Sequence, residues 1–191
     1  MNKRFSHLIT FYFFLQLILF ANHEDEILGN WVTAEGQSRV EIFKKDDLYF
    51  GKIVALKEPY YLSTENIGVV GTPRLDSYNP DQSLASRPMI GIELMTNFHF
   101  DGEKWVGGRI YDPQNGKNYK CRISLAEDGT LHVRGYVGFS MLGRTTVWEP
   151  TEVYLKRELA FLGIENCSCQ SSEKASKATE EIDHNGTAEM D

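Results

Sequence analysis

Alternation of apolar and polar residues, interrupted by tight turns, runs from Met89 to Glu149 and most constrains the fold. A period of two residues is the pattern of a β-strand with one buried face and one solvent-exposed face. The dipeptides Asp101-Gly102 and Asp128-Gly129 separate two pairs of these segments, and Asp-Gly is a strong hairpin signal. The stretch is therefore predicted to be a meander of antiparallel strands, each joined to the next.

Eight strands are predicted in total, three before this meander and five within it. They cover Ile27–Thr33, Ser38–Lys44, Leu48–Leu56, Met89–Phe100, Lys104–Asp112, Lys117–Leu125, Thr130–Gly138 and Arg144–Glu149. Sequential strands with one apolar face form either a β-sandwich or a closed up-and-down barrel. Closure removes the exposed sheet edges, and glycines at bends, such as Gly107-Gly108, favour it. We predict an all-β, eight-stranded antiparallel up-and-down barrel over residues 27–150, with a β-sandwich as the alternative.

The segments on either side of the barrel have different patterns. Residues 1–21 join a positive start, Lys3-Arg4, to the apolar run Leu8–Phe20, which predicts a signal peptide and hence a secreted or periplasmic protein. An uncleaved anchor is the alternative, although a span needs about 20 apolar residues. Residues 151–163 predict a short C-terminal helix whose leucines lie on the barrel wall. Residues 164–191 are polar and predict a disordered tail.

Charge and cysteine usage exclude several classes of protein. The net charge of −7 and the pI near 5.3 argue against a nucleic-acid binder and against docking on anionic membranes. Cys121 lies on the apolar side of a strand and is predicted to be buried, whereas Cys167 and Cys169 lie in the tail. Their spacing predicts neither a disulfide scaffold nor a metal site, and no cofactor motif is present. The sequence does not set the oligomeric state.

A connection of about thirty residues, Lys57 to Arg87, separates the third and fourth strands. Loops of this length are commonly lids or binding loops, and its aromatic and branched residues predict an ordered one. Within it, the segment Asp76–Asp81 could gather carboxylates for Ca²⁺ or for acid–base chemistry. The structural alternative is a turn in which Arg87 pairs with Asp76 or Asp81. The later motif Asp112–Gly116 is predicted to be a hairpin turn.

Several motifs occur in the order that is typical of one family. They are Gly29-x-Trp31, Asn79-Pro80-Asp81, Arg87-Pro88, Tyr111-Asp112-Pro113-x-Asn115-Gly116 and Gly143-Arg144-Thr145-x-x-Trp148. From Ile27 to about Trp148 the chain resembles the uncharacterised bacterial exported family labelled domain of unknown function 2147. The resemblance implies export and a β-barrel-like fold, and the family has no agreed activity. Pro150 stands where members of the family commonly carry Arg.

The start of the first strand also resembles that of lipocalins. They begin with Gly-x-Trp, here Gly29-x-Trp31, and place an Arg near the last strand over this Trp. The resemblance implies a cation–π contact between Trp31 and Arg144 at the closed end of the barrel. Trp31, Arg144 and Trp148 are accordingly predicted to form the seam where the last strand meets the first.

The leading functional hypothesis is an exported, lipocalin-like, non-enzymatic protein that binds a small apolar or amphipathic ligand, with the long loop as a lid. The residues predicted to contact the ligand are Tyr60, Tyr61, Asp76, Tyr78, Asn79, Asp81, Arg87 and Tyr111. One alternative is an envelope enzyme in which Asp76, Asp81, Arg87 and Asp112 converge. Another is a structural or partner-binding envelope module with a filled lumen and an exposed apolar patch.

Overall fold

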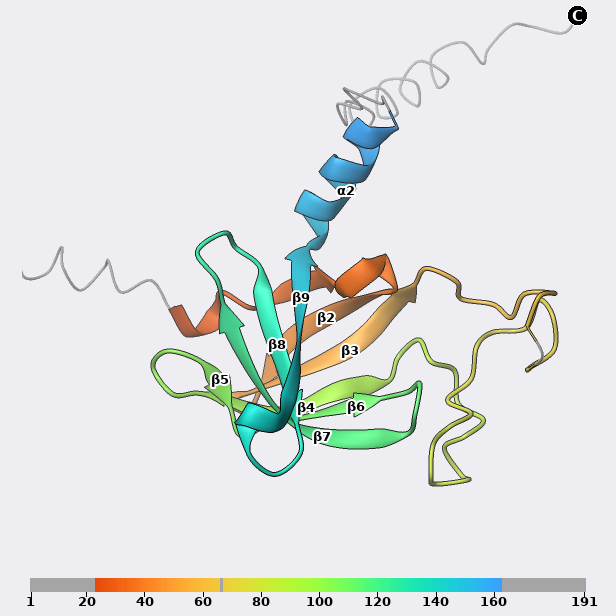
Figure 1. The fold of residues 1–191 in the computed structure, drawn as a ribbon, viewed down its shortest axis with the longest axis horizontal. Helices are drawn as coiled ribbons and strands as arrows, with labels where there is room; N and C mark the ends of the chain where they lie inside the picture. Colours follow the sequence, from red (N-terminus) through yellow and green to blue (C-terminus); the bar gives the residue numbers. More distant parts are fainter. Residues whose placement is uncertain (1–22, 66, 163–191) are drawn as a thin grey trace, which may run out of the picture. The chain divides into compact units, whose positions relative to one another are not determined.

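Nine strands form a closed antiparallel barrel in the computed structural model, which describes residues 23–65 and 67–162 (Figure 1). They are β1 (Gly29–Val32), β2 (Ser38–Lys45), β3 (Leu48–Leu56), β4 (Glu93–Phe100), β5 (Trp105–Val106), β6 (Arg109–Asp112), β7 (Lys117–Leu125), β8 (Leu131–Tyr136) and β9 (Gly143–Pro150). The predicted signal peptide and the predicted tail lie outside the described residues.

Pairing of the first strand with the last closes the barrel. Trp31 of β1 lies opposite Pro150 of β9, and Val32 lies opposite Glu149. The other pairings follow chain order, including β3 with β4 across the long connection, except that β5 and β6 each pair with β4 and β7 and not with each other. The predicted barrel is therefore confirmed, and the alternative β-sandwich is wrong.

The predicted strand Lys104–Asp112 is divided into β5 and β6 at Gly107-Gly108. The two short strands share one position in the barrel wall, between β4 and β7, so the eight predicted strands correspond to nine observed ones. Gly107 has a φ of +78°, which favours glycine. A Cβ on Gly108 would overlap the ring of Phe98. The glycine pair thus bends the chain between β5 and β6 and lets the Phe98 ring approach the backbone there.

Strand β4 departs from the strict alternation predicted for Met89–Phe100. The register between β3 and β4 shifts twice, and Asn97 has a φ of +60°. These irregularities turn Met95 into the barrel, where its side chain is buried and lies against Gly51. Ile90, predicted to be on the apolar face, is exposed instead. Bulges of this kind change which residues of a strand face the core.

Large side chains of the hydrophobic core fill the end of the barrel at which β4 connects to β5. Its largest fully buried side chains there are Trp105, Tyr49 and Phe98. The 3-10 helix η1 (His23–Asp25) lies at this end, because the Trp105 indole donates to the Glu24 carbonyl at 2.9 Å and the Tyr49 hydroxyl donates to Asp25 at 2.7 Å. The acidic residues after the predicted signal peptide therefore cap the barrel.

The predicted seam is formed only in part. Trp148 is buried opposite Leu131, and the Trp31 indole donates to the Ile27 carbonyl at 2.8 Å. Arg144 lies opposite Gly135 at the far end of β9 from Pro150 and is exposed. The predicted cation–π contact between Trp31 and Arg144 is therefore wrong, because strand pairing sets the two residues at opposite ends of β9.

The C-terminal helix α2 (Thr151–Phe161) follows β9 directly, close to the predicted bounds 151–163. None of its residues is buried, and Leu155 and Leu159 are exposed. The packing of this helix on the barrel wall stays a prediction. Among the helices of residues 23–65 and 67–162, none combines the length and the apolar character that crossing a bilayer requires.

Candidate functional site

The connection between β3 and β4 spans residues 57–92, all described except residue 66, and lies at one end of the barrel; we call it the lid segment (Figure 1). Two isolated bridges fold it back on itself, Tyr60 with Pro73 and Leu75 with Pro88. Backbone hydrogen bonds surround both, such as that from the Arg74 amide to the Pro59 carbonyl at 3.0 Å. The prediction of an ordered loop is confirmed for its described residues.

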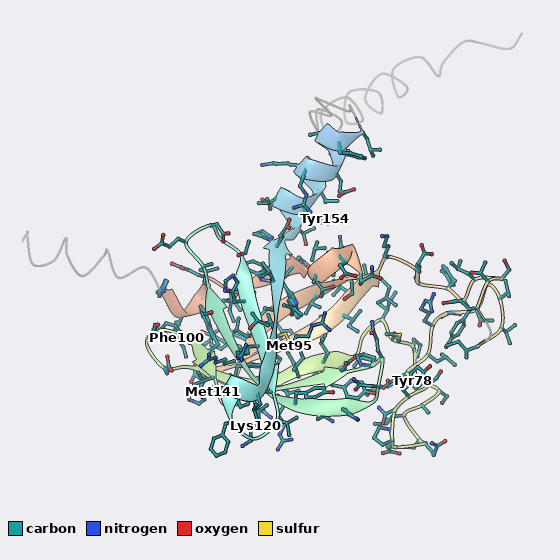
Figure 2. The ribbon with its side chains drawn as sticks, viewed as in Figure 1. Tyr78, Met95, Phe100, Lys120, Met141 and Tyr154 are labelled. Atoms are coloured by element: carbon teal, nitrogen blue, oxygen red, sulfur yellow. The ribbon has the colours of Figure 1, made fainter. Side chains whose placement is uncertain are left out.

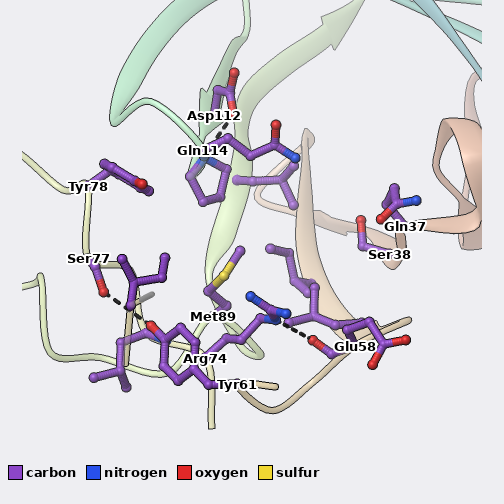
Figure 3. A pocket seen from close by; sticks show the side chains of 16 residues that line it. Gln37, Ser38, Glu58, Tyr61, Arg74, Ser77, Tyr78, Met89, Asp112 and Gln114 are labelled. Atoms are coloured by element: carbon purple, nitrogen blue, oxygen red, sulfur yellow. Dashed lines mark hydrogen bonds between the residues drawn. The ribbon is translucent and has the colours of Figure 1, made fainter. Parts of the chain in front are cut away.

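A cavity of about 470 Å³ lies between the lid segment and this end of the barrel (Figure 3). Its apolar lining comes from Ile53, Leu56, Tyr61, Ile67, Leu75, Met89, Leu94 and Pro113. Its polar lining comes from Gln37, Ser38, Glu58, Arg74, Ser77, Tyr78, Asp112 and Gln114. The volume falls in the range of about 300–1,000 Å³ that is typical of small-molecule sites.

Arg74 is the cation of the cavity wall, and its charge is already paired. Its Nη2 atom contacts the two carboxylate oxygens of Glu65 at 2.8 and 3.0 Å, and its Nε donates to the Glu58 carbonyl at 2.6 Å. The guanidinium also lies 5.4 Å from the centre of the Tyr61 ring. The Leu62 amide and then Arg74 lower the pKa of Glu65, which keeps this carboxylate ionised.

A buried carboxylate, Asp76, fixes the lid segment to the barrel. Its Oδ1 accepts a 2.6 Å hydrogen bond from the Tyr111 hydroxyl, and its Oδ2 accepts from Asn79 at 2.7 Å and from Arg87 at 3.0 Å. Burial, followed by the bond to Asp76, raises the pKa of Tyr111 to about 12, so this hydroxyl remains a donor. The Asp76 side chain is fully buried, and its carboxylate accepts hydrogen bonds from all three of these donors, so neither carboxylate oxygen is left without a partner.

The turn between β6 and β7 supplies a second contact with the lid segment. Asp112 accepts from the Gln114 amide at 2.9 Å and from the Asn115 side chain at 2.7 Å, which confirms the predicted hairpin turn. Gly116 has a φ of +68°, and a Cβ there would overlap the carbonyl oxygen of Tyr78. Only glycine allows the two backbones to approach this closely.

The residues predicted to contact a ligand fall into three groups. Tyr61 and Tyr78 line the cavity. Asp76, Asn79, Arg87 and Tyr111 form the cluster around the buried Asp76 carboxylate and do not line the cavity. Tyr60 and Asp81 are exposed and do not line the cavity. The aromatic content of the lid segment was a useful signal, whereas Asp76 and Arg87 mark where the segment is anchored.

Sequence reasoning missed most of the cavity wall. Met89, Leu75 and Arg74 come from the lid segment itself, whereas Gln37 ends the connection between β1 and β2 and Ser38 begins β2. Alternate connections of an antiparallel barrel lie at the same end, so the predicted topology contained a signal for Gln37 and Ser38. No local motif marks the others.

The convergence required of an envelope enzyme is not found among the described residues. Asp76 and Arg87 meet, but the Asp81 carboxylate accepts from the Ser83 hydroxyl at 2.7 Å. That contact and the Ser83 amide lower the pKa of Asp81, with a smaller contribution from Arg87. Asp112 is held in its own turn. Residues 23–65 and 67–162 also contain no cluster of His, Cys, Asp and Glu suited to a metal ion.

Comparison with known proteins supports the fold and names a family. A search of curated proteins found no relative. A solved structure titled "Protein HP1028 from the human pathogen Helicobacter pylori belongs to the lipocalin family" is similar, with a TM-score of 0.55 and 19% identity, and covers 78% of this chain and 96% of that one. The model of DUF2147, described as "Uncharacterized protein conserved in bacteria", matches residues 29–150. The chain therefore belongs to the DUF2147 family and has a lipocalin-like fold.

Proposed function

We propose that this protein is an exported binding protein that holds a small amphipathic ligand in the cavity beneath the lid segment. The observation that carries the proposal is the cavity of about 470 Å³ with a lining of both apolar and polar residues. Export is inferred from the sequence of residues 1–21. The lipocalin-like neighbour supports the barrel fold on which the cavity is built.

The apolar walls suit the tail of such a ligand. Ile53, Leu56 and Leu94 come from the barrel, and Leu75 and Met89 close over them from the lid segment. Figure 3 shows the Met89 side chain among the other lining residues of the cavity. Transfer of an apolar tail from water to this surface is favourable by about 0.8 kcal/mol for each buried methylene group.

The charges of the cavity lining favour a neutral or cationic head group over a carboxylate. Arg74 already contacts Glu65 through two oxygens, which leaves its positive charge neutralised. Asp112 and Glu58 add carboxylates to the same lining. A free carboxylate on the ligand would meet like charges and no unpaired cation among the described lining residues, whereas hydroxyl or amine donors would find acceptors.

Displacement of the neutral fluorophore N-phenyl-1-naphthylamine tests both parts of the proposal. Monodecanoylglycerol, decylamine and decanoate share a similar tail, and at pH 7 we expect the first two to displace the probe at least about tenfold more effectively than decanoate. Stronger displacement by decanoate would overturn the assignment of the head group.

Variants that fill the cavity test its location. Met89→Trp and Leu75→Trp are expected to reduce binding of the probe at least about tenfold. Val147→Trp, on the exposed face of β9, is the matched control and is expected to bind normally. Near-ultraviolet circular dichroism verifies folding. Two cavity variants are used so that the test still stands if one of them does not fold. Equal binding by all three variants and the parent chain would place the ligand elsewhere and contradict the proposal.

A further inference from the structure

An exposed apolar loop joins β8 to β9, and it has no role in the cavity. In this loop, residues 137–142, Phe139 is 81% exposed and Met141 is 88% exposed, and Val137 and Leu142 are also largely exposed. Side chains of this size are rarely clustered on a surface without a partner. The loop matches the exposed apolar patch that was expected of a partner-binding module.

Arg134 holds the backbone of the apolar loop in place. Its Nε donates to the Ser140 carbonyl at 2.8 Å and its Nη2 donates to the Met141 carbonyl at 3.2 Å. Its Nη1 donates to the Thr145 hydroxyl at 2.8 Å, which ties the loop to β9. The Leu142 amide also donates to the Phe139 carbonyl at 3.0 Å. The apolar side chains are therefore presented by an ordered turn.

The sheet face next to this loop is basic, although the whole chain carries a net charge of −7. Arg109 lies opposite Lys120, and Arg122 lies opposite Arg134. Like charges directly opposite on a sheet are destabilising. Of residues 23–65 and 67–162, none forms an ion pair with Arg109, Lys120 or Arg122. Overall acidity therefore conceals a local basic face.

The basic face and the apolar loop adjoin each other. Lys120 lies opposite Tyr136, and Tyr136 lies opposite Gly143, so one row of the sheet leads to both ends of the loop. Figure 2 shows Lys120 and Met141 near the same edge of the barrel. From Lys117 to Trp148 the acidic residues are Glu127 and Asp128, which lie in the β7–β8 turn at the other end of these strands.

We propose that the apolar loop and the basic face form a docking surface for a bilayer that carries anionic lipid headgroups. Apolar side chains at a hairpin tip can enter the boundary between headgroups and acyl chains, while adjacent cations contact the anionic headgroups. A protein partner would need a pocket that receives the protruding Phe139 and Met141. This inference does not depend on occupation of the cavity.

Quenching of a tryptophan in the loop tests the proposal. Met141→Trp in the full chain is mixed with vesicles of phosphatidylcholine or of phosphatidylcholine with phosphatidylglycerol, both containing a brominated phosphatidylcholine. Trp31, Trp105 and Trp148 are buried and give a constant background. Glu127→Trp, at the opposite turn, is the control. We expect strong quenching of Met141→Trp that requires phosphatidylglycerol, and little quenching of Glu127→Trp.

The cations are tested in the Met141→Trp background by a matched pair of double variants. Arg109→Gln with Lys120→Gln is expected to raise the lipid concentration for half-maximal quenching about 25-fold, since each cation near the surface contributes about fivefold. Lys45→Gln with Lys57→Gln removes the same charge from exposed positions elsewhere and is expected to have little effect. No quenching at any composition, or equal effects of the two pairs, would overturn the proposal and leave an acidic protein as the partner.

Discussion

The Tyr111 hydroxyl donates a 2.6 Å hydrogen bond to the buried carboxylate of Asp76 and thereby joins β6 to the lid segment. The two residues are 35 positions apart in the chain. The Asp76 carboxylate also accepts hydrogen bonds from Arg87 and Asn79 of its own segment. One carboxylate therefore organises the turn and attaches it to the barrel. The lid segment is consequently held at a point outside the cavity that it covers.

Replacing Tyr111 by Phe is expected to loosen the lid segment. The change leaves Asp76 Oδ1 buried without its donor, which costs about 1–3 kcal/mol, or more when the group is charged. Urea unfolding gives the change in global stability, and hydrogen exchange at the Asp76 amide, which donates to the Arg87 carbonyl, reports local opening. Tyr60→Phe, at a half-exposed position, is the control and is expected to change stability by less than about 0.5 kcal/mol. Unchanged exchange in Tyr111→Phe would contradict this function of the bond.

Gly116→Ala is expected to separate the lid segment from the β6–β7 turn. The new Cβ meets the backbone oxygen of Tyr78, which cannot rotate away as a side chain would. Gly129→Ala is a matched control, because Gly129 has a similar φ of +79° but no atom within 4 Å of the added Cβ. Both variants incur about 1–2 kcal/mol of left-handed strain, and Gly116→Ala is expected to lose a further ~1–3 kcal/mol from the overlap. Equal unfolding free energies of the two variants in urea would rule out a close backbone contact here.

Strand positions could be predicted well wherever the two-residue period is regular. Residues Lys117–Leu125 form β7 with the predicted bounds, because Cys121 and Ile123 face the core while Lys120 and Arg122 face solvent. The same reasoning failed in β4, where a bulge near Asn97 turns Met95 inward. A bulge is set by the packing of neighbouring strands, here of Met95 against Gly51, and leaves no clear pattern in one strand.

The candidate site could be predicted only in outline. The length and aromatic content of the lid segment indicated a lid, and Tyr61 and Tyr78 do line the cavity. The roles of Asp76 and Arg74 depend on partners brought close by the fold, such as Tyr111 for Asp76. Charged residues in a long loop look the same in the sequence whether they bind a ligand or fix the loop, so residues that fix the loop, such as Asp76 and Arg87, were predicted to contact a ligand.

Cys121 is expected to resist alkylation in the folded protein. Burial raises the pKa of its thiol to about 12, so at pH 8 roughly one molecule in ten thousand would carry the reactive thiolate even if reagent could enter. Iodoacetamide labelling followed by peptide mass mapping separates Cys121 from the other two cysteines. We expect labelling of Cys121 only after denaturation in guanidinium, and rapid labelling under native conditions would show that the barrel opens at β7.

Asp25→Asn is expected to destabilise the capped end of the barrel in a pH-dependent way. The hydrogen bond from Tyr49 and then the interaction with Lys44 lower the pKa of Asp25 in the folded protein. A lowered folded pKa contributes stability above the unfolded value, near 3.9, and this stability is lost as the pH falls through the folded pKa. The variant should therefore be about 1 kcal/mol less stable than the parent chain at pH 7, with the difference shrinking below about pH 4.

Urea unfolding at several pH values between 7 and 3 measures this difference directly. Asp46→Asn, in the exposed turn between β2 and β3, removes the same charge from a solvent-exposed position, and its effect is expected to be small throughout. Tyr49→Phe removes the leading donor to Asp25 and is expected to reproduce part of the pH dependence. If Asp25→Asn and Asp46→Asn respond alike to pH, the Asp25 carboxylate does not stabilise the capped end, which is then held by its other contacts, such as that of Trp105 with Glu24.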